Sequence, residues 1–195
     1  MKNIILASKS KRRSELLSDI GLSFKVIASD IDETSVVKGD PDEYVMILAE
    51  KKLMEVDKDV KDDSIIIIAA DTIVCYDGMI LGKPEDEADA FRMLAMLSGD
   101  WHEVYTGLAI KRGDKLVVDY EVTRVKFREL DDEEIESYIK TEEPLDKAGA
   151  YGIQELGSLF VEKIEGDFYN VVGLPVCKLG NLLKTNFDMN IFDMR

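Results

Sequence analysis

The 195-residue sequence holds few residues of the kinds that zinc sites and serine or cysteine nucleophiles depend on. It has one histidine, His102, and two cysteines, Cys75 and Cys177. A single histidine excludes His-rich metal sites and argues against a Ser-His-Asp triad. The cysteines lie in apolar surroundings without metal-ligand spacing, so we expect both to be reduced thiols in the core. An enzyme of this composition would work with carboxylates, lysines and a metal ion.

Long apolar runs are also missing. No run approaches the ~20 residues that are needed to span a membrane, and Ile65–Ala70 is short and is followed by an acid. The N-terminal apolar run is interrupted at Ser8, so it lacks the apolar core of a signal peptide. We therefore expect a cytoplasmic protein without a membrane partner. The length suits one domain over residues 1–195 or two small lobes, and the sequence shows no clear boundary between lobes.

Positive charge is scarce and unevenly placed. There are 25 Lys and Arg against 40 Asp and Glu, which gives a net charge of −15. A nucleic-acid partner requires a broad basic face, so this balance argues against one. The first thirteen residues are the exception, because they carry five positive charges and no acid. The five are Lys2, Lys9, Lys11, Arg12 and Arg13.

The local pattern around these charges predicts an anion site. Asn3–Ala7 is a short apolar run typical of a buried strand, Ser8 and Ser10 interrupt it, and a helical pattern begins at Arg13. A strand, a turn and a helix N-terminus direct free backbone N–H groups at an anion. Arginines beside the positive end of a helix dipole need a negative partner, and a polyphosphate would suit. The alternative is a basic tail on a solvated surface.

Spacing and turn residues predict most of the other elements. Helices are expected over Pro41–Val56, Glu87–Leu97, Asp131–Lys140 and Leu174–Lys184. Hairpins are expected for Trp101–Lys111 with Lys115–Phe127, and for Leu159–Ile164 with Phe168–Val172.

Asp71 is the main candidate for a catalytic acid or base. It follows Ser64–Ala70, which is apolar on both faces and predicts a central strand that ends at Asp71-Thr72. Ligands gather at the carboxyl ends of such strands, and partial burial raises the pKa of a carboxylate and makes it a better base. The alternative is that Asp71 caps a turn together with Thr72.

Two lysines are candidates for binding an anion. Lys52 lies on the apolar stripe of its predicted helix, so it either extends to solvent or meets a buried anion. Lys83 lies in a turn after a short strand. With Ser8, Ser10 and the two arginines, these lysines would suit phosphates. Glu33 and Asp71 offer oxygen ligands for Mg²⁺ or Mn²⁺, and such a site can hydrolyse a phosphoanhydride.

Six segments in order along nearly the whole chain share one resemblance. They are Leu6–Arg13, Ala69–Thr72, Leu81–Pro84, Leu97–Gly99, Asp146–Gln154 and Asn170–Pro175. Together they resemble the Maf family of nucleoside triphosphate pyrophosphatases, once linked to septum formation. The resemblance implies an α/β fold with a mixed twisted sheet, flanking helices and two lobes around a cleft, similar to inosine triphosphate pyrophosphatases.

The resemblance also implies an activity and a set of site residues. A nucleoside triphosphate, dTTP or UTP in one branch of the family, is cleaved between its α and β phosphates with a divalent cation. Asp71 then matches the proton acceptor, and Glu33 an acidic position near the metal. The phosphate-binding positions match Ser8, Arg13, Lys52 and Lys83, and the positions for base specificity match Arg12, Thr72 and Gln154. One departure, Lys9-Ser-Lys11, adds charge where the family often has a small residue and a proline.

Other interpretations stay open. In one, the chain is a pyrophosphatase for a modified or methylated nucleotide. In the other, it is a nucleotide-binding regulator of septum formation that does not act as a catalyst. The closing segment Asn186–Arg195 contains two phenylalanines. It predicts either a homodimer contact or a segment that folds back on its own core.

Overall fold

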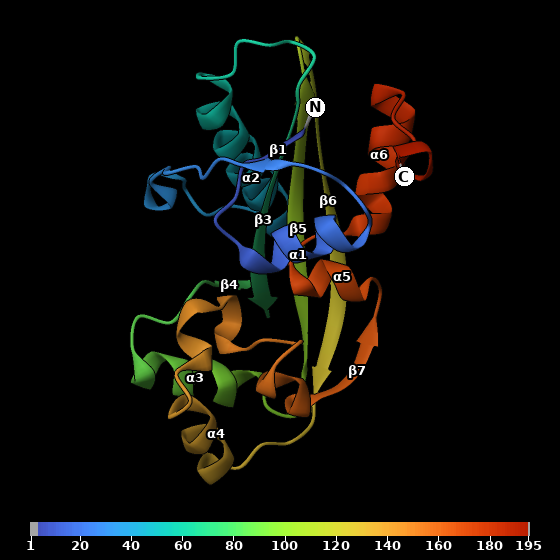
Figure 1. Cartoon of the computed structure of the whole chain (residues 1–195). Helices are drawn as coiled ribbons and strands as arrows, with labels where there is room; N and C mark the ends of the chain where they lie inside the picture. The colour runs from blue at the N-terminus through green and yellow to red at the C-terminus, as the bar shows by residue number, and fades with distance from the viewer. Residues whose placement is uncertain (1–3, 195) are drawn as a thin grey trace. The chain divides into compact units, whose positions relative to one another are not determined.

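The computed structural model describes residues 4–194 and has a mixed α/β fold (Figure 1). The expected charge of Lys2 and the expected start of the first strand at Asn3 lie outside the described residues. Among those described, seven strands form one sheet in the order β2-β1-β3-β5-β6-β7, and β4 pairs with β3. This arrangement confirms the predicted α/β class.

The sheet contains both parallel and antiparallel pairs. Strand β1 (Ile4–Leu6) pairs in parallel with β2 (Lys25–Val26) and with β3 (Ile66–Tyr76). Strand β4 (Met79–Leu81) runs antiparallel to β3, and β7 (Val161–Glu165) runs antiparallel to β6. The two long strands of the predicted hairpin are β5 (Trp101–Arg112) and β6 (Lys115–Phe127).

The chain divides into two compact units. The first takes the residues up to Asp71, Thr106–Glu121 and the residues from Gly173 onward, and the second takes Thr72–Tyr105 and Val122–Val172. Asp71 is therefore the last residue of its segment in the first unit. The assignment of one domain with two lobes around a cleft stays a prediction.

The core of the first unit follows from the two-residue period of its strands. Ile5 of β1 and Ile67 and Ala69 of β3 belong to one buried cluster with Ala49 and Leu53. These last two lie on α2 (Pro41–Asp57), so α2 covers this face of the sheet. Alternate residues of β1 and β3 point to the opposite face and are buried as well, as a central strand requires. Two further helices of this unit are α1 (Lys11–Asp19) and α6 (Val176–Phe187).

The second unit is built around short helices and an aromatic cluster. Its helices are α3 (Glu87–Leu97), α4 (Asp132–Ile139) and α5 (Phe168–Val172). Edge-to-face ring contacts join His102, Phe127, Tyr151, Phe160 and Tyr138. Such contacts are the favoured geometry for packed rings. The only histidine of the chain is thus a core residue.

One predicted strand end was wrong. Strand β3 does not stop at Asp71-Thr72 but continues to Tyr76 and turns at Asp77-Gly78 into β4. A carboxylate can be buried inside a strand when it has a partner of opposite charge. Asp71 has such a partner, because it forms an ion pair with Lys52, so the strand continues beyond Asp71.

The predicted hairpin at Phe168–Val172 was also wrong, because this segment is the helix α5. The Asp167 carboxylate accepts the Tyr169 N–H at 2.8 Å, which turns the chain out of β7. The Asn170 side chain is fully buried and donates to the Val104 carbonyl and to the Thr123 hydroxyl at 2.9 and 3.0 Å. These local and long-range hydrogen bonds favour the helix over a second strand.

The predicted environment of one cysteine needed correction. Cys75 is buried as expected, but Cys177 is exposed. The buried face of α6 is formed by Leu179, Leu183 and Phe187, and Cys177 lies about 200° around the helix from Leu179. Of the two C-terminal phenylalanines, Phe187 is therefore in the core and Phe192 is 82% exposed. Among the described residues, no helix has the length and apolar composition that crossing a membrane requires.

Candidate active site

The basic N-terminal segment forms a hydrogen-bonded turn between β1 and α1. The Ser8 hydroxyl accepts the Ser10 N–H and the Arg13 Nη1–H, each at 3.2 Å. Ser10 is the N-cap of α1, and its hydroxyl accepts the Arg13 N–H. The Arg13 Nε–H donates to the Gly173 carbonyl at 2.8 Å. The turn therefore places a serine hydroxyl, a guanidinium and a helix N-terminus together, an arrangement that would suit an anion.

The acidic part of the site is centred on Lys52. Its ammonium forms ion pairs with Asp71 and with Glu33, the latter with Nζ and Oε1 2.6 Å apart. The strand period explains the encounter, because Asp71 shares a face with Ile67 and Ala69, and α2 covers that face. The buried anion expected beside Lys52, from its place on the apolar stripe of the helix, is thus the Asp71 carboxylate.

The environment of Asp71 suits a base. Its side chain is 9% exposed, whereas that of Glu33 is 54% exposed. Burial raises the pKa of Asp71, and the charges of Lys52 and Arg13 oppose this rise. Burial also lowers the pKa of Arg13, and the charge of Asp71 opposes that shift. The Asp71 carboxylate is therefore coupled electrostatically to both Lys52 and Arg13 within the first unit.

The donor set is compatible with a divalent cation. Glu33 and Asp71 both reach a single ammonium group, so two carboxylates converge on one positive centre. Mg²⁺ is often held by one or two carboxylates and completed by water and substrate phosphates. Among the described residues, no group of three or more His, Cys, Asp or Glu side chains is placed to hold a metal ion. A metal here would thus depend on the substrate for its remaining ligands.

Three of the other predicted residues, Thr72, Lys83 and Gln154, belong to the second unit, and Arg12 belongs to the first. Thr72 follows Asp71 on β3 and is half-buried, and Lys83 is exposed in the turn after β4. Gln154 is exposed in the loop that follows the helical turn Ala148–Ala150. The Gly149 N–H donates to the Gly82 carbonyl at 3.0 Å. This hydrogen bond joins the stretch that leads to Gln154 to the turn that presents Lys83. Arg12 lies on α1, beside Arg13.

Two features near the site were not found by reasoning from the sequence. The Gly173 carbonyl holds Arg13, although the segment Asn170–Pro175 had no predicted role. Tyr44 is buried on α2, and burial together with the charges of Asp71 and Glu33 raises its pKa. The Pro41–Val56 pattern places Tyr44 on the apolar stripe of its helix. That pattern cannot distinguish a tyrosine beside charged side chains from one in the apolar core.

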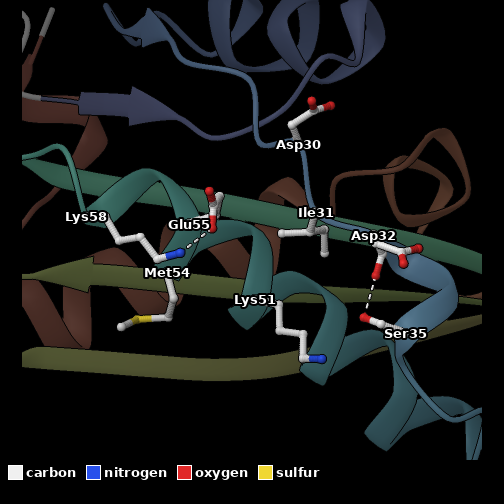
Figure 2. Close-up of a pocket in the computed structure, with 8 residues that line it drawn as sticks. All are labelled: Asp30, Ile31, Asp32, Ser35, Lys51, Met54, Glu55 and Lys58. Carbon is white, nitrogen blue, oxygen red and sulfur yellow. Dashed lines mark hydrogen bonds and ion pairs between the residues drawn. The ribbon is translucent and has the colours of Figure 1, made fainter.

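A separate groove of about 460 Å³ lies in the first unit (Figure 2). It runs between the loop that leads to Glu33 and an outer face of α2. Its lining residues are Asp30, Ile31, Asp32, Ser35, Lys51, Met54, Glu55 and Lys58. None of the predicted site residues lines this groove. The charges of its acids and lysines cancel in part, since Lys58 and Glu55 form an ion pair. The predicted chemistry therefore belongs to the Asp71 region.

Comparison with protein-family models matches residues 3–186 to the family described as "Maf-like protein". The chain belongs to the Maf family. The match spans the N-terminal turn, α2, β3 and the loop with Gln154. It thereby covers every residue that the resemblance singled out.

Individual relatives support this assignment. A protein of Caldanaerobacter subterraneus subsp. tengcongensis is 53% identical over 94% of this chain and 89% of its own length. One of Alkaliphilus oremlandii is 52% identical over 98% of this chain and all of its own. Both are named dTTP/UTP pyrophosphatase. Among solved structures, the Ham1 protein of Staphylococcus aureus is 16% identical, with a TM-score of 0.43 over 64% of this chain and 71% of its own.

Proposed function

We propose that this Maf protein hydrolyses nucleoside triphosphates, with dTTP and UTP preferred, to the nucleoside monophosphate and pyrophosphate. The observation that carries the proposal is the buried Asp71 carboxylate, which Lys52 holds in the unit that also contains the Ser8–Arg13 turn. A base and an anion site in one unit suit the hydrolysis of a phosphoanhydride. The names of relatives at 52–53% identity support the substrate.

Each group has a role that its environment supports. Asp71 takes the proton from an attacking water, because burial raises its pKa and improves it as a base. Arg13 and the Ser8 hydroxyl bind phosphate oxygens and stabilise the charge that develops on them. The Lys52 ammonium orients Asp71 and adds positive charge beside the phosphates. Lys83, exposed in its turn, provides a further cation for the triphosphate.

A divalent cation, Mg²⁺ or Mn²⁺, belongs to the proposal. Glu33 and Asp71 would hold it, since both supply carboxylate oxygens that converge on one positive centre. When bound, it would neutralise charge on the phosphates. Arg12, Thr72 and Gln154 would select the base.

The cellular part of the proposal rests on the family. We place the enzyme in the cytoplasm, where it would limit unwanted nucleotides and act in the arrest of cell division. The exposed Phe192 is the residue that a homodimer contact of the C-terminal segment would use.

A panel of nucleotides with product identification tests this function. The purified protein is incubated with dTTP, UTP, CTP, ATP, GTP and methylated nucleotides, with Mg²⁺, with Mn²⁺ or with a chelator. We expect pyrophosphate and the monophosphate, the highest kcat/KM for dTTP and UTP, and no turnover with chelator. An Asp71→Asn preparation controls for contaminating hydrolases. Release of orthophosphate and a diphosphate would overturn the proposal, and a clear preference for a methylated nucleotide would replace its substrate.

A further inference from the structure

Lys147 is a buried lysine in the second unit for which the proposed chemistry has no use. Its side chain is 6% exposed, and lysines are seldom buried to this degree unless they are paired. Its Nζ lies 2.8 Å from Asp146 Oδ1, 3.2 Å from Glu155 Oε2 and 2.9 Å from the Glu143 carbonyl oxygen. Two of these contacts are hydrogen bonds and the third is an ion pair, so the ammonium is held by protein groups on three sides.

The partners of Lys147 surround the short loop that carries Gln154. Glu155, the residue after Gln154, is one of them. On the other side of Gln154, the backbone at Gly152 lies against the aliphatic stem of the lysine. A Cβ atom added to Gly152 would lie 2.7 Å from Lys147 Cε and 3.0 Å from Cδ. The lysine thus contacts the loop on both sides of Gln154.

Glu143 fixes the same loop through its backbone. Its carboxylate accepts the Leu156 N–H and the Gly157 N–H, each at 3.1 Å, and the Tyr138 hydroxyl at 2.8 Å. The Tyr138 hydroxyl in turn accepts the Gly152 N–H at 3.3 Å. Since the Glu143 carbonyl also accepts from Lys147, the lysine and the glutamate form one connected network.

Gln154 itself is left out of this network. It is exposed, and its side-chain amide forms no hydrogen bond to any described residue. A loop whose backbone is fixed on both sides, while one amide projects from it unpaired, is suited to present that amide to a ligand. Fixing the loop beforehand reduces the entropy that an ordered contact would otherwise cost.

We propose that Lys147 is a positioning residue for base selectivity, because it fixes the loop that presents Gln154 to the nucleotide base. The inference rests on the proposed function for the identity of the ligand. It adds that selectivity depends on a buried cation that does not touch the substrate.

The test compares selectivity in matched variants. Lys147→Met keeps the stem and removes the ammonium. Glu155→Gln weakens the same network from an exposed position, so it keeps the test valid if Lys147→Met does not fold. Glu162→Gln is the control, because Glu162 also pairs with a lysine at 3.2 Å and is exposed to a similar degree, 53% against 48%. The measured quantity is the ratio of kcat/KM for dTTP to that for CTP.

We expect Lys147→Met to lower this ratio about tenfold, the size of one lost directed hydrogen bond. Glu155→Gln should lower it less, and Glu162→Gln should leave it unchanged. Combined with Gln154→Ala, Lys147→Met should add little further loss of selectivity, since both remove the same contact. Amides of Gly152, Leu156 and Gly157 should exchange faster with deuterium in the Lys147 variant.

A purely structural role predicts a different result. It would lower kcat/KM for dTTP and CTP by the same factor, and that outcome would overturn the inference. If the wild type binds dTTP more tightly than CTP but cleaves neither, the proposed function fails alone, and the ratio of Kd values then tests Lys147 in the same variants. If the wild type neither cleaves nor binds with selectivity, the inference fails as well.

Discussion

Replacement of Lys52 by methionine should destabilise the first unit strongly, and a second substitution should reverse much of the loss. Lys52 is 14% exposed and pairs with the Asp71 carboxylate, which is 9% exposed. Removing the lysine leaves a buried carboxylate whose remaining positive neighbour is Arg13. Removing one partner of a buried ion pair costs about 3–5 kcal/mol in the free energy of unfolding. We expect Lys52→Met to fall in this range.

The double variant Lys52→Met/Asp71→Asn should be more stable than Lys52→Met. A neutral amide in the same place costs only about 1–3 kcal/mol if it is left without a partner. The second substitution should therefore recover about 2 kcal/mol of the loss. The coupling free energy between the two sites is larger than this recovery by the cost of Asp71→Asn alone. Glu33→Gln serves as the control, because Glu33 pairs with the same ammonium at 2.6 Å but is 54% exposed. An exposed pair contributes at most about 1 kcal/mol.

Urea unfolding of the wild type, both single variants, the double variant and the control measures these free energies. The reasoning predicts a large loss for Lys52→Met, a partial recovery in the double variant and a small change for Glu33→Gln. Additive effects of Lys52→Met and Asp71→Asn would refute it, because the two side chains would then not interact. An equal loss for Glu33→Gln and Lys52→Met would show that burial does not set the cost.

Three further predictions concern pH, packing and thiol reactivity. His102 is 2% exposed, and burial lowers its pKa to about 3. Because the imidazole titrates near 6.5 when unfolded, its contribution to stability is complete above that pH and is lost as the pH falls towards 3. Between pH 8 and pH 5 the loss is about 2 kcal/mol, and a His102→Phe variant with the same pH slope as the wild type would contradict this. Gly107→Ala should destabilise by about 3 kcal/mol or more, because the new Cβ would lie 2.2 Å from a backbone oxygen of α2. Gly39→Ala, with nothing within 4 Å, should be nearly neutral in the same thermal melts, and equal losses would speak against this packing. In native protein, a thiol reagent should modify the exposed Cys177 quickly and the buried Cys75 only on unfolding. Equal rates for the two thiols would contradict this difference in burial.

Elements with local signals could be predicted closely from the sequence. The helix α3 has the predicted bounds Glu87–Leu97, because Asp86 caps its first turn and Gly99 adopts a positive φ after its end. The turn Asp77-Gly78 has a local signal too, because an Asp-Gly pair favours the positive φ that both residues adopt. In these places each residue choice acts on its near neighbours, so the pattern contains the needed information.

Features that depend on distant partners could not be predicted in this way. The strand β3 passes through Asp71 because of a lysine 19 positions earlier in the chain. Reasoning from the stripe of α2 placed Lys52 beside a buried anion or solvent, but it did not identify Asp71 as that anion. The network of Glu143 has the same character, since its carboxylate accepts backbone N–H groups 13 and 14 residues away. No local pattern marks such a contact.

The central claim is that the Asp71 carboxylate activates water for cleavage of a bound nucleoside triphosphate. The most direct test measures turnover and binding of dTTP by the Asp71→Asn variant in one set of conditions. The account predicts that kcat falls by about 10²–10⁴, the usual contribution of a general base. Without a divalent cation, it also predicts a Kd for dTTP no weaker than that of the wild type, because a negative charge beside the phosphates has been removed. An Asp71→Asn enzyme whose kcat stays within a fewfold of the wild-type value would contradict the claim.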